Sequence, residues 1–271
     1  MKINANDSLG GALFQEYGCS GVPHLVFIDK EQKEIDRIIG YQPPEEYLLN
    51  IKDIASNKNT FKELSNKFEQ GDYSVETLEL LAKKYENKGD IDAAANLYTK
   101  LLQLGNLSTE SFWKAKYIIA VQALSNGETN KLVEYAETYP ESPFTKDAYL
   151  TLIRHFNVEN NIDEEIKLYI FVITQYPSDP SILNMYAWRM SEIDKNLGHA
   201  LEMASLAVTL TKSEPQTQAN ILDTKAEVLF KLKRYNEAIN IISEALTIDP
   251  ESMYFKSQKE KFMDAKNNID D

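Results

Sequence analysis

Alternation of apolar and polar positions marks a short α/β segment at the start of the chain. Two β-rich runs, at 25–29 and 34–39, are separated by a polar turn, which predicts a hairpin. A helix is expected at 7–17, before the hairpin. Another should begin at Pro43-Pro44, because proline is favoured in the first turn of a helix. With a short strand at 2–4, the predicted order is β-α-β-β-α.

Helical periodicity replaces the strand-like runs from about residue 73 onward. Between 222 and 250, alanines stand at 226, 238 and 245 and the segment closes on Pro250. Small residues at such positions let two helices approach closely, while larger residues fill the space between units. This pattern resembles the tetratricopeptide repeat, a helix pair of about 34 residues.

Weaker copies of the same pattern indicate about five helix pairs followed by a capping helix. The fold class we expect is mainly α, a tetratricopeptide-like α-solenoid preceded by an incomplete α/β segment. The expected organisation is a partial α/β domain at 1–55, a helical linker at 56–72, repeats at 73–265 and a frayed tail at 266–271.

The run YGCSGVPHLVFID at 17–29 resembles the part of thioredoxin that leads into its closing hairpin, and 33–41 resembles that hairpin. The resemblance implies a cis Pro23 and a backbone at Val22 that pairs with an extended peptide. Val22 and Pro23 are therefore the candidate peptide-binding residues. The Cys-x-x-Cys of thioredoxins is absent, because Cys19 is the only cysteine.

The thioredoxin resemblance also implies that strands are missing from the middle of the sheet. The run at 25–29 would then have an unpaired edge, which favours recruitment of another strand or self-association. We therefore interpret Met1 as an artificial start of a longer natural product.

Composition narrows the classes of partner. The protein has 42 Asp and Glu against 29 Lys and Arg, a net charge of −13, which disfavours nucleic acids and anionic membrane surfaces. Apolar runs are far shorter than the roughly 20 residues of a membrane span. As written, the protein is expected in the cytoplasm, or in the periplasm or outside the cell if an upstream secretion signal was lost.

Candidate chemistry is sparse. His24, His155 and His199 lack the spacing of metal ligands, so neither metal nor cofactor is expected. Cys19 is interpreted as a small apolar filler, or alternatively as a redox-sensing thiol. A few aromatic residues can line a groove for a protein or peptide partner.

Three functions remain open. One is a protein-interaction scaffold attached to a thioredoxin-like module, in a redox or protein-folding context. Another is a truncated thiol–disulfide oxidoreductase whose dithiol lies upstream of Met1. The third is a non-catalytic docking platform. The catalytic set within these residues is expected to be empty.

Overall fold

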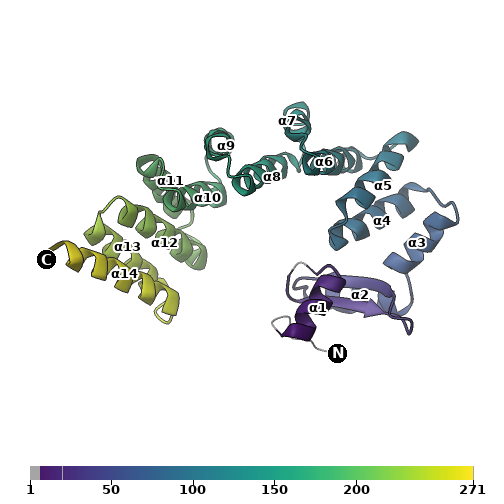
Figure 1. The fold of residues 1–271 in the computed structure, drawn as a ribbon, viewed down its shortest axis with the longest axis horizontal. Coiled ribbons are helices and arrows are strands. Elements are labelled where there is room, and N and C mark those ends of the chain that lie inside the picture. The colour runs from purple at the N-terminus through teal and green to yellow at the C-terminus, as the bar shows by residue number, and fades with distance from the viewer. Residues whose placement is uncertain (1–6, 20, 271) are drawn as a thin grey trace. The chain divides into compact units, whose positions relative to one another are not determined.

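The structure is a computed structural model that describes residues 7–19 and 21–270, so the strand expected at 2–4 lies outside the described residues. The polypeptide divides into two compact units, Met1–Arg154 (unit 1) and His155–Asp271 (unit 2), which are described separately. Figure 1 shows that helices dominate both units. In the part that the structure describes, no helix is long and apolar enough to span a membrane.

Unit 1 begins with the predicted hairpin and its flanking helices. Strands β1 and β2 are antiparallel, with His24 opposite Ile39 and Phe27 opposite Asp36, and they form a two-stranded sheet among the described residues. The Val22–Pro23 peptide is cis. The elements are α1 (Ser8–Glu16), β1 (His24–Ile28), β2 (Glu34–Ile39), α2 (Pro44–Ala55) and α3 (Phe61–Glu69).

Local chemistry explains where these helices begin. The Asp7 carboxylate accepts a hydrogen bond from the Gly10 N–H at 2.6 Å and so caps α1. Thr60 caps α3 by accepting from the Glu63 N–H, and Glu63 accepts in return from the Asn59 N–H. The bond to Thr60 satisfies an N–H group that the helix leaves unpaired, and the bond from Asn59 fixes the residue before the cap. The expected bounds of α1 and the expected start of α2 are confirmed to within one residue.

Helix pairs follow α3. Unit 1 continues with α4 (Val75–Lys88), α5 (Ile91–Leu104), α6 (Thr109–Ser125) and α7 (Thr129–Thr138), and α8 (Thr145–Val158) crosses the boundary between the units. Unit 2 holds α9 (Ile162–Gln175), α10 (Pro180–Glu192), α11 (Leu197–Leu210), α12 (Pro215–Lys231), α13 (Tyr235–Ile248) and α14 (Met253–Asp270). The last helix therefore extends beyond Ala265, where the capping helix was expected to end.

The alanines of the repeat pattern lie in the core. Ala82 and Ala94 of the first pair are fully buried, as are Ala226 and Ala238 of the last. A methyl group at each of these positions lets the two helices of a pair pack closely. The packing role that the sequence predicts for these positions is confirmed.

Buried charges join the sheet to the first repeat within unit 1. The Arg37 guanidinium of β2 donates to both oxygens of Glu34, at 2.7 and 2.8 Å, and to the Tyr17 carbonyl. On α4, Lys84 pairs with Asp36, and Lys88 pairs with Glu34 at 3.0 Å. Every carboxylate of this cluster, the junction network, therefore has a cationic partner.

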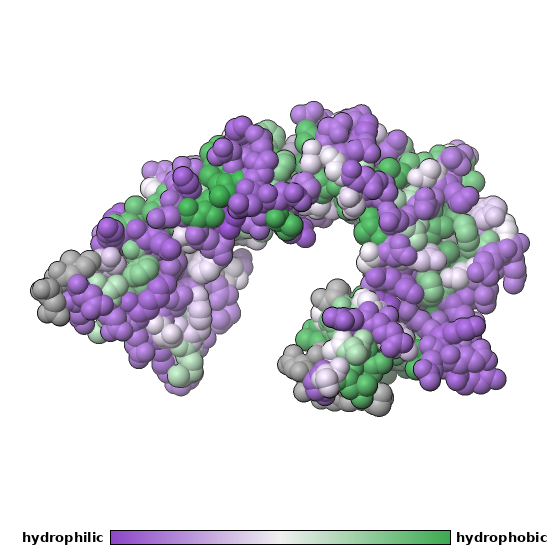
Figure 2. All heavy atoms as spheres, viewed as in Figure 1, coloured by the Kyte–Doolittle hydropathy of each residue, from purple (hydrophilic) through white to green (hydrophobic). Residues whose placement is uncertain are grey.

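Apolar residues gather on the surface of the segment that carries the sheet (Figure 2). Val22 is 78% exposed and Tyr41 is 83% exposed, and Leu9, Leu48 and Leu49 are each more than half exposed.

Candidate functional site

The most informative feature of the repeats is a set of buried oxygens with no donor. Among the described residues, five buried side-chain atoms lack a hydrogen-bond partner, and three of them are Glu79 Oε1, Asn184 Oδ1 and Asp223 Oδ1. Buried polar groups are nearly always paired, so three such atoms at equivalent places require an explanation.

The three residues occupy the same position in the first helix of their pairs. Each stands three residues before a fully buried alanine: Glu79 before Ala82, Asn184 before Ala187 and Asp223 before Ala226. Residues three apart on a helix share a face. In the pair formed by α6 and α7, Tyr117 takes this position, and its hydroxyl faces the Thr151 hydroxyl at 3.4 Å.

Two of these residues lie in unit 2, where α10 packs against α12. We call Asn184 and Asp223 the acceptor pair. Asp223 is only 6% exposed. Its Oδ2 accepts a hydrogen bond from the Tyr254 hydroxyl of α14 at 3.1 Å, which leaves Oδ1 without a donor. Burial raises the pKa of Asp223 to about 6, and the bond from Tyr254 only partly offsets that rise.

A second carboxylate lies one turn further along α12 and has a cationic partner. Glu227 accepts from Lys261 Nζ at 2.6 Å. The same ammonium donates to Gln258 and lies 4.6 Å from the centroid of the Phe230 ring. Because these contacts hold Lys261 at Glu227, it does not supply the donor that Asp223 lacks.

The buried Glu165 is a different case. It stands where the repeat pattern has an alanine, and it is fully buried. Arg189 of α10 donates to both of its oxygens, at 2.7 and 3.0 Å, and Asn157 donates to one of them. With all of these donors in place, Glu165 serves the packing of α9 and α10 rather than a ligand.

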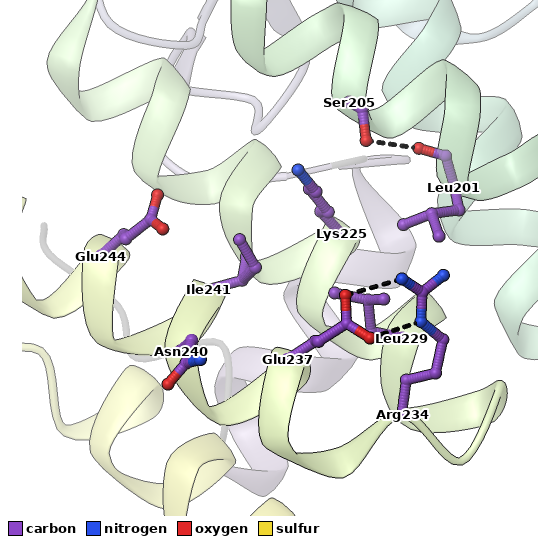
Figure 3. A pocket seen from close by; sticks show the side chains of 9 residues that line it. All are labelled: Leu201, Ser205, Lys225, Leu229, Arg234, Glu237, Asn240, Ile241 and Glu244. Atoms are coloured by element: carbon purple, nitrogen blue, oxygen red, sulfur yellow. Dashed lines mark hydrogen bonds and ion pairs between the residues drawn. The ribbon is translucent and has the colours of Figure 1, made fainter.

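A hollow of about 370 Å³ lies among α11, α12 and α13. Figure 3 shows Arg234 and Glu237 bonded to each other at its edge, while Lys225, Ile241 and Glu244 line the remainder. The two bonds of that ion pair are 2.6 and 2.7 Å long. The Arg234 guanidinium at this hollow is therefore already paired with a carboxylate.

Cys19, Val22 and Pro23, which the sequence singled out, directly precede β1. Cys19 is half-buried, and burial raises the pKa of its thiol, although Arg37 opposes the rise. The Arg37 guanidinium is near enough to act on the thiol, because it bonds the carbonyl of Tyr17 close by. Val22 projects into solvent, and nothing in the described residues tests its predicted peptide contact.

In the part of the protein that the structure describes, no group of three or more His, Cys, Asp or Glu residues is arranged to hold an ion. His24 lies 3.5 Å from the Arg37 guanidinium, and burial together with that positive charge lowers its pKa.

Comparison with known proteins identifies the repeat directly. Residues 219–252, which contain most of α12 and all of α13, match the sequence model of the family described as "Tetratricopeptide repeat". Over these residues the protein is therefore similar to a tetratricopeptide repeat. No curated protein matches the sequence.

Solved structures of repeat proteins resemble this one at low identity. BtubC (BKLC) from P. vanneervenii is 14% identical, with a TM-score of 0.49 over 70% of this protein and 87% of its own length. The putative kinesin light chain repeats of Podospora anserina are 14% identical, with a TM-score of 0.48 over 67% and 97%. YrrB, described as "a TPR protein with an unusual peptide-binding site", is 13% identical, with a TM-score of 0.47 over 73% and 97%.

The acceptor pair was not singled out from the sequence. Its signature there is a polar residue three positions before a core alanine, which also fits an ordinary solvent-facing residue. Whether Asp223 lacks a donor depends on α14, because Tyr254 and Lys261, the nearby groups that could donate to it, belong to that helix.

Proposed function

We propose that the protein is an interaction scaffold whose unit 2 holds an extended segment of a partner protein. Tetratricopeptide repeats support this role, because stacked helix pairs present long surfaces suited to peptides. The observation that carries the proposal is the acceptor pair, which places undonated oxygens on the adjacent helices α10 and α12.

Energetics support a ligand as the source of the missing donors. Leaving a buried acceptor unpaired costs about 1–3 kcal/mol. An extended peptide carries an N–H donor at nearly every residue, so it can satisfy such acceptors along its length. If only a bound segment supplies the donors, the cost of the unpaired acceptors is removed only in the complex.

A peptide library tests the proposal. The full 271-residue protein is immobilised and exposed to acetylated, amidated random dodecapeptides, and retained peptides are sequenced by mass spectrometry. We expect retention well above that on a matrix carrying bovine serum albumin. Retention equal to that matrix would overturn the proposal.

The finer part of the proposal concerns the N-terminal segment. We propose that α1, the hairpin and α2 are a thioredoxin-like module without its catalytic dithiol, and that the scaffold acts in a redox or protein-folding context. The exposed position of Val22 supports it. Substituting Val22→Asp should then weaken binding of an extended peptide to this segment, and unchanged binding would contradict the module.

The alternative function is thiol–disulfide exchange by a longer parent protein. It needs a second cysteine, which these 271 residues lack. Reduction of insulin by this protein alone would show that it catalyses thiol–disulfide exchange without a second cysteine. The intact mass of the endogenous protein, with a search for Cys-x-x-Cys in any added segment, separates the alternative from the scaffold.

We also propose that copies of the protein associate through the edge of the sheet. Within the described residues, β1 pairs with β2 alone, so its other edge has unpaired N–H and carbonyl groups. Sedimentation equilibrium at rising protein concentration tests it, and a monomer at all concentrations would exclude it.

A further inference from the structure

Asp223 differs from the other acceptor of unit 2 because it carries a charge. A carboxylate has only acceptor oxygens, so its unpaired Oδ1 can be satisfied by nothing except a donor. Asn184 is less selective, since an amide can bond either a backbone N–H or a backbone carbonyl. The ligand chemistry is therefore set mainly by Asp223.

Charge around Asp223 is unbalanced by one unit. Asp223 and Glu227 contribute two carboxylates, while Lys261 contributes one ammonium, and that ammonium pairs with Glu227 at 2.6 Å. Among the described residues, the neutral Tyr254 hydroxyl is the one donor to the Asp223 carboxylate. Buried charges are normally paired, so the arrangement is complete only when a second cation arrives.

We propose that Asp223 receives the basic group of a lysine or arginine in the bound segment, and that Asn184 bonds the backbone of the same segment. This inference rests on the proposed function, and it specifies the partner as a basic peptide. The net charge of −13 favours the approach of such a partner over that of an acidic one.

Tyr254 is suited to admit the ligand. It is 52% exposed, and one hydrogen bond of 3.1 Å joins it to Asp223. Its hydroxyl also accepts from Gln258 at 2.7 Å, so it keeps a partner on α14 when it turns away from Asp223. Packed helices lie about 8–10 Å apart. An extended peptide spans that distance in about three residues, so the basic residue and the group that bonds Asn184 should be about three residues apart.

An oriented library tests the partner's chemistry on the full protein. The probes are acetylated, amidated dodecapeptides with random residues around a fixed central position that is lysine, arginine, norleucine, glutamine or glutamate. We expect lysine and arginine pools to be retained at least about tenfold more than the norleucine pool. The variant Asp223→Asn, which keeps the shape and removes the charge, should reduce that ratio to less than about twofold.

The matched control is Asp163→Asn. It makes the same substitution at an exposed position of α9 in the same unit, and its preference for basic pools should equal that of the unchanged protein. Circular dichroism and thermal melting establish that each variant is folded. If Asp223→Asn does not fold, a lysine-to-norleucine change in one selected peptide gives the same comparison on the unchanged protein.

The outcomes separate this inference from the proposed function. Retention of peptides with no basic preference, or a preference that Asp223→Asn leaves intact, would overturn the basic partner and leave the scaffold standing. Retention of no peptide would overturn both. A basic preference that disappears in Asp223→Asn alone supports both.

Discussion

The two units treat buried carboxylates differently. In unit 1, Glu34 receives hydrogen bonds from Arg37 and an ion pair from Lys88, and these cations lower its pKa even though burial opposes them. In unit 2, Asp223 has a single neutral donor, and burial raises its pKa to about 6.

The contrast distinguishes carboxylates whose cationic partners stabilise the fold from a carboxylate that, in our proposal, gains a cationic partner only when a ligand binds. A carboxylate whose pKa falls on folding stabilises the folded state at neutral pH, whereas one whose pKa rises destabilises it there. The junction network therefore holds the sheet to α4. Burial of the Asp223 carboxylate destabilises the folded state, and the hydrogen bond from Tyr254 only partly offsets this. Such a cost is common where function constrains a residue.

The largest expected effect comes from breaking the junction network. The variant Arg37→Leu should destabilise unit 1 by about 3–5 kcal/mol, because it leaves a buried carboxylate with one cation instead of two. Unfolding in urea measures this, and in a Trp188→Phe background the remaining tryptophan, Trp113, reports on unit 1. The control Lys131→Leu breaks an exposed ion pair with Glu134 in the same unit and should change stability far less. Equal effects of the two substitutions would refute the structural role of the network.

Much of the fold could be predicted from the sequence because its determinants are local. Pro44 at the first turn of α2, the polar turn of the hairpin and the alanines at 82 and 226 each act on neighbouring residues or at a fixed helical spacing. The sheet's connection to the repeats was not predicted. It depends on Asp36 meeting Lys84, which is 48 positions away in the sequence.

The sequence predicted the kind of site but not the residues that form it. Repeats imply a surface for a protein partner, but the special status of Asp223 depends on Tyr254, which lies 31 positions later. Cys19 shows the same limit, because its cationic neighbour Arg37 comes from β2 and is not adjacent in sequence. Which buried charge lacks a partner is a property of tertiary packing, and sequence patterns do not report it.

A second way to sharpen the contrast lies within unit 2. Glu165 is buried and fully partnered like the junction network, so Glu165→Ala should destabilise unit 2 by about 2–4 kcal/mol. Adding Arg189→Leu removes the orphaned guanidinium and should recover more than half of the loss. Urea unfolding followed by the helical circular dichroism signal measures both. A double variant no more stable than the single one would show that the ion pair is not the source of the loss.

A smaller effect of opposite sign is expected at Asp223. Its pKa rises from 3.8 to about 6 on folding, so between these values the folded state holds more protons than the unfolded state. Stability therefore falls as the pH rises from about 4 to about 6, against the background of Glu227, Lys261 and Tyr254, which also face this carboxyl. The variant Asp223→Asn should lack that fall and gain about 1–2 kcal/mol near neutral pH, but little at about pH 4.

Urea midpoints of the two proteins across that pH range measure the difference at Asp223. The control Asp163→Asn, at an exposed position, should show no comparable gain near neutral pH. A stability gain that is independent of pH, or a loss at neutral pH, would mean that Asp223 is adequately paired in the free protein.

The smallest effect is expected at Cys19, where the question is reactivity. Burial raises the pKa of this thiol, so at neutral pH a smaller fraction is thiolate than in a free cysteine. Iodoacetamide should therefore modify the native protein several times more slowly than it modifies glutathione, and at the glutathione rate in concentrated guanidinium chloride. Native labelling faster than glutathione would show that the nearby Arg37 outweighs burial. Cys19 would then be a reactive group rather than a packing residue, which would support its interpretation as a redox-sensing thiol.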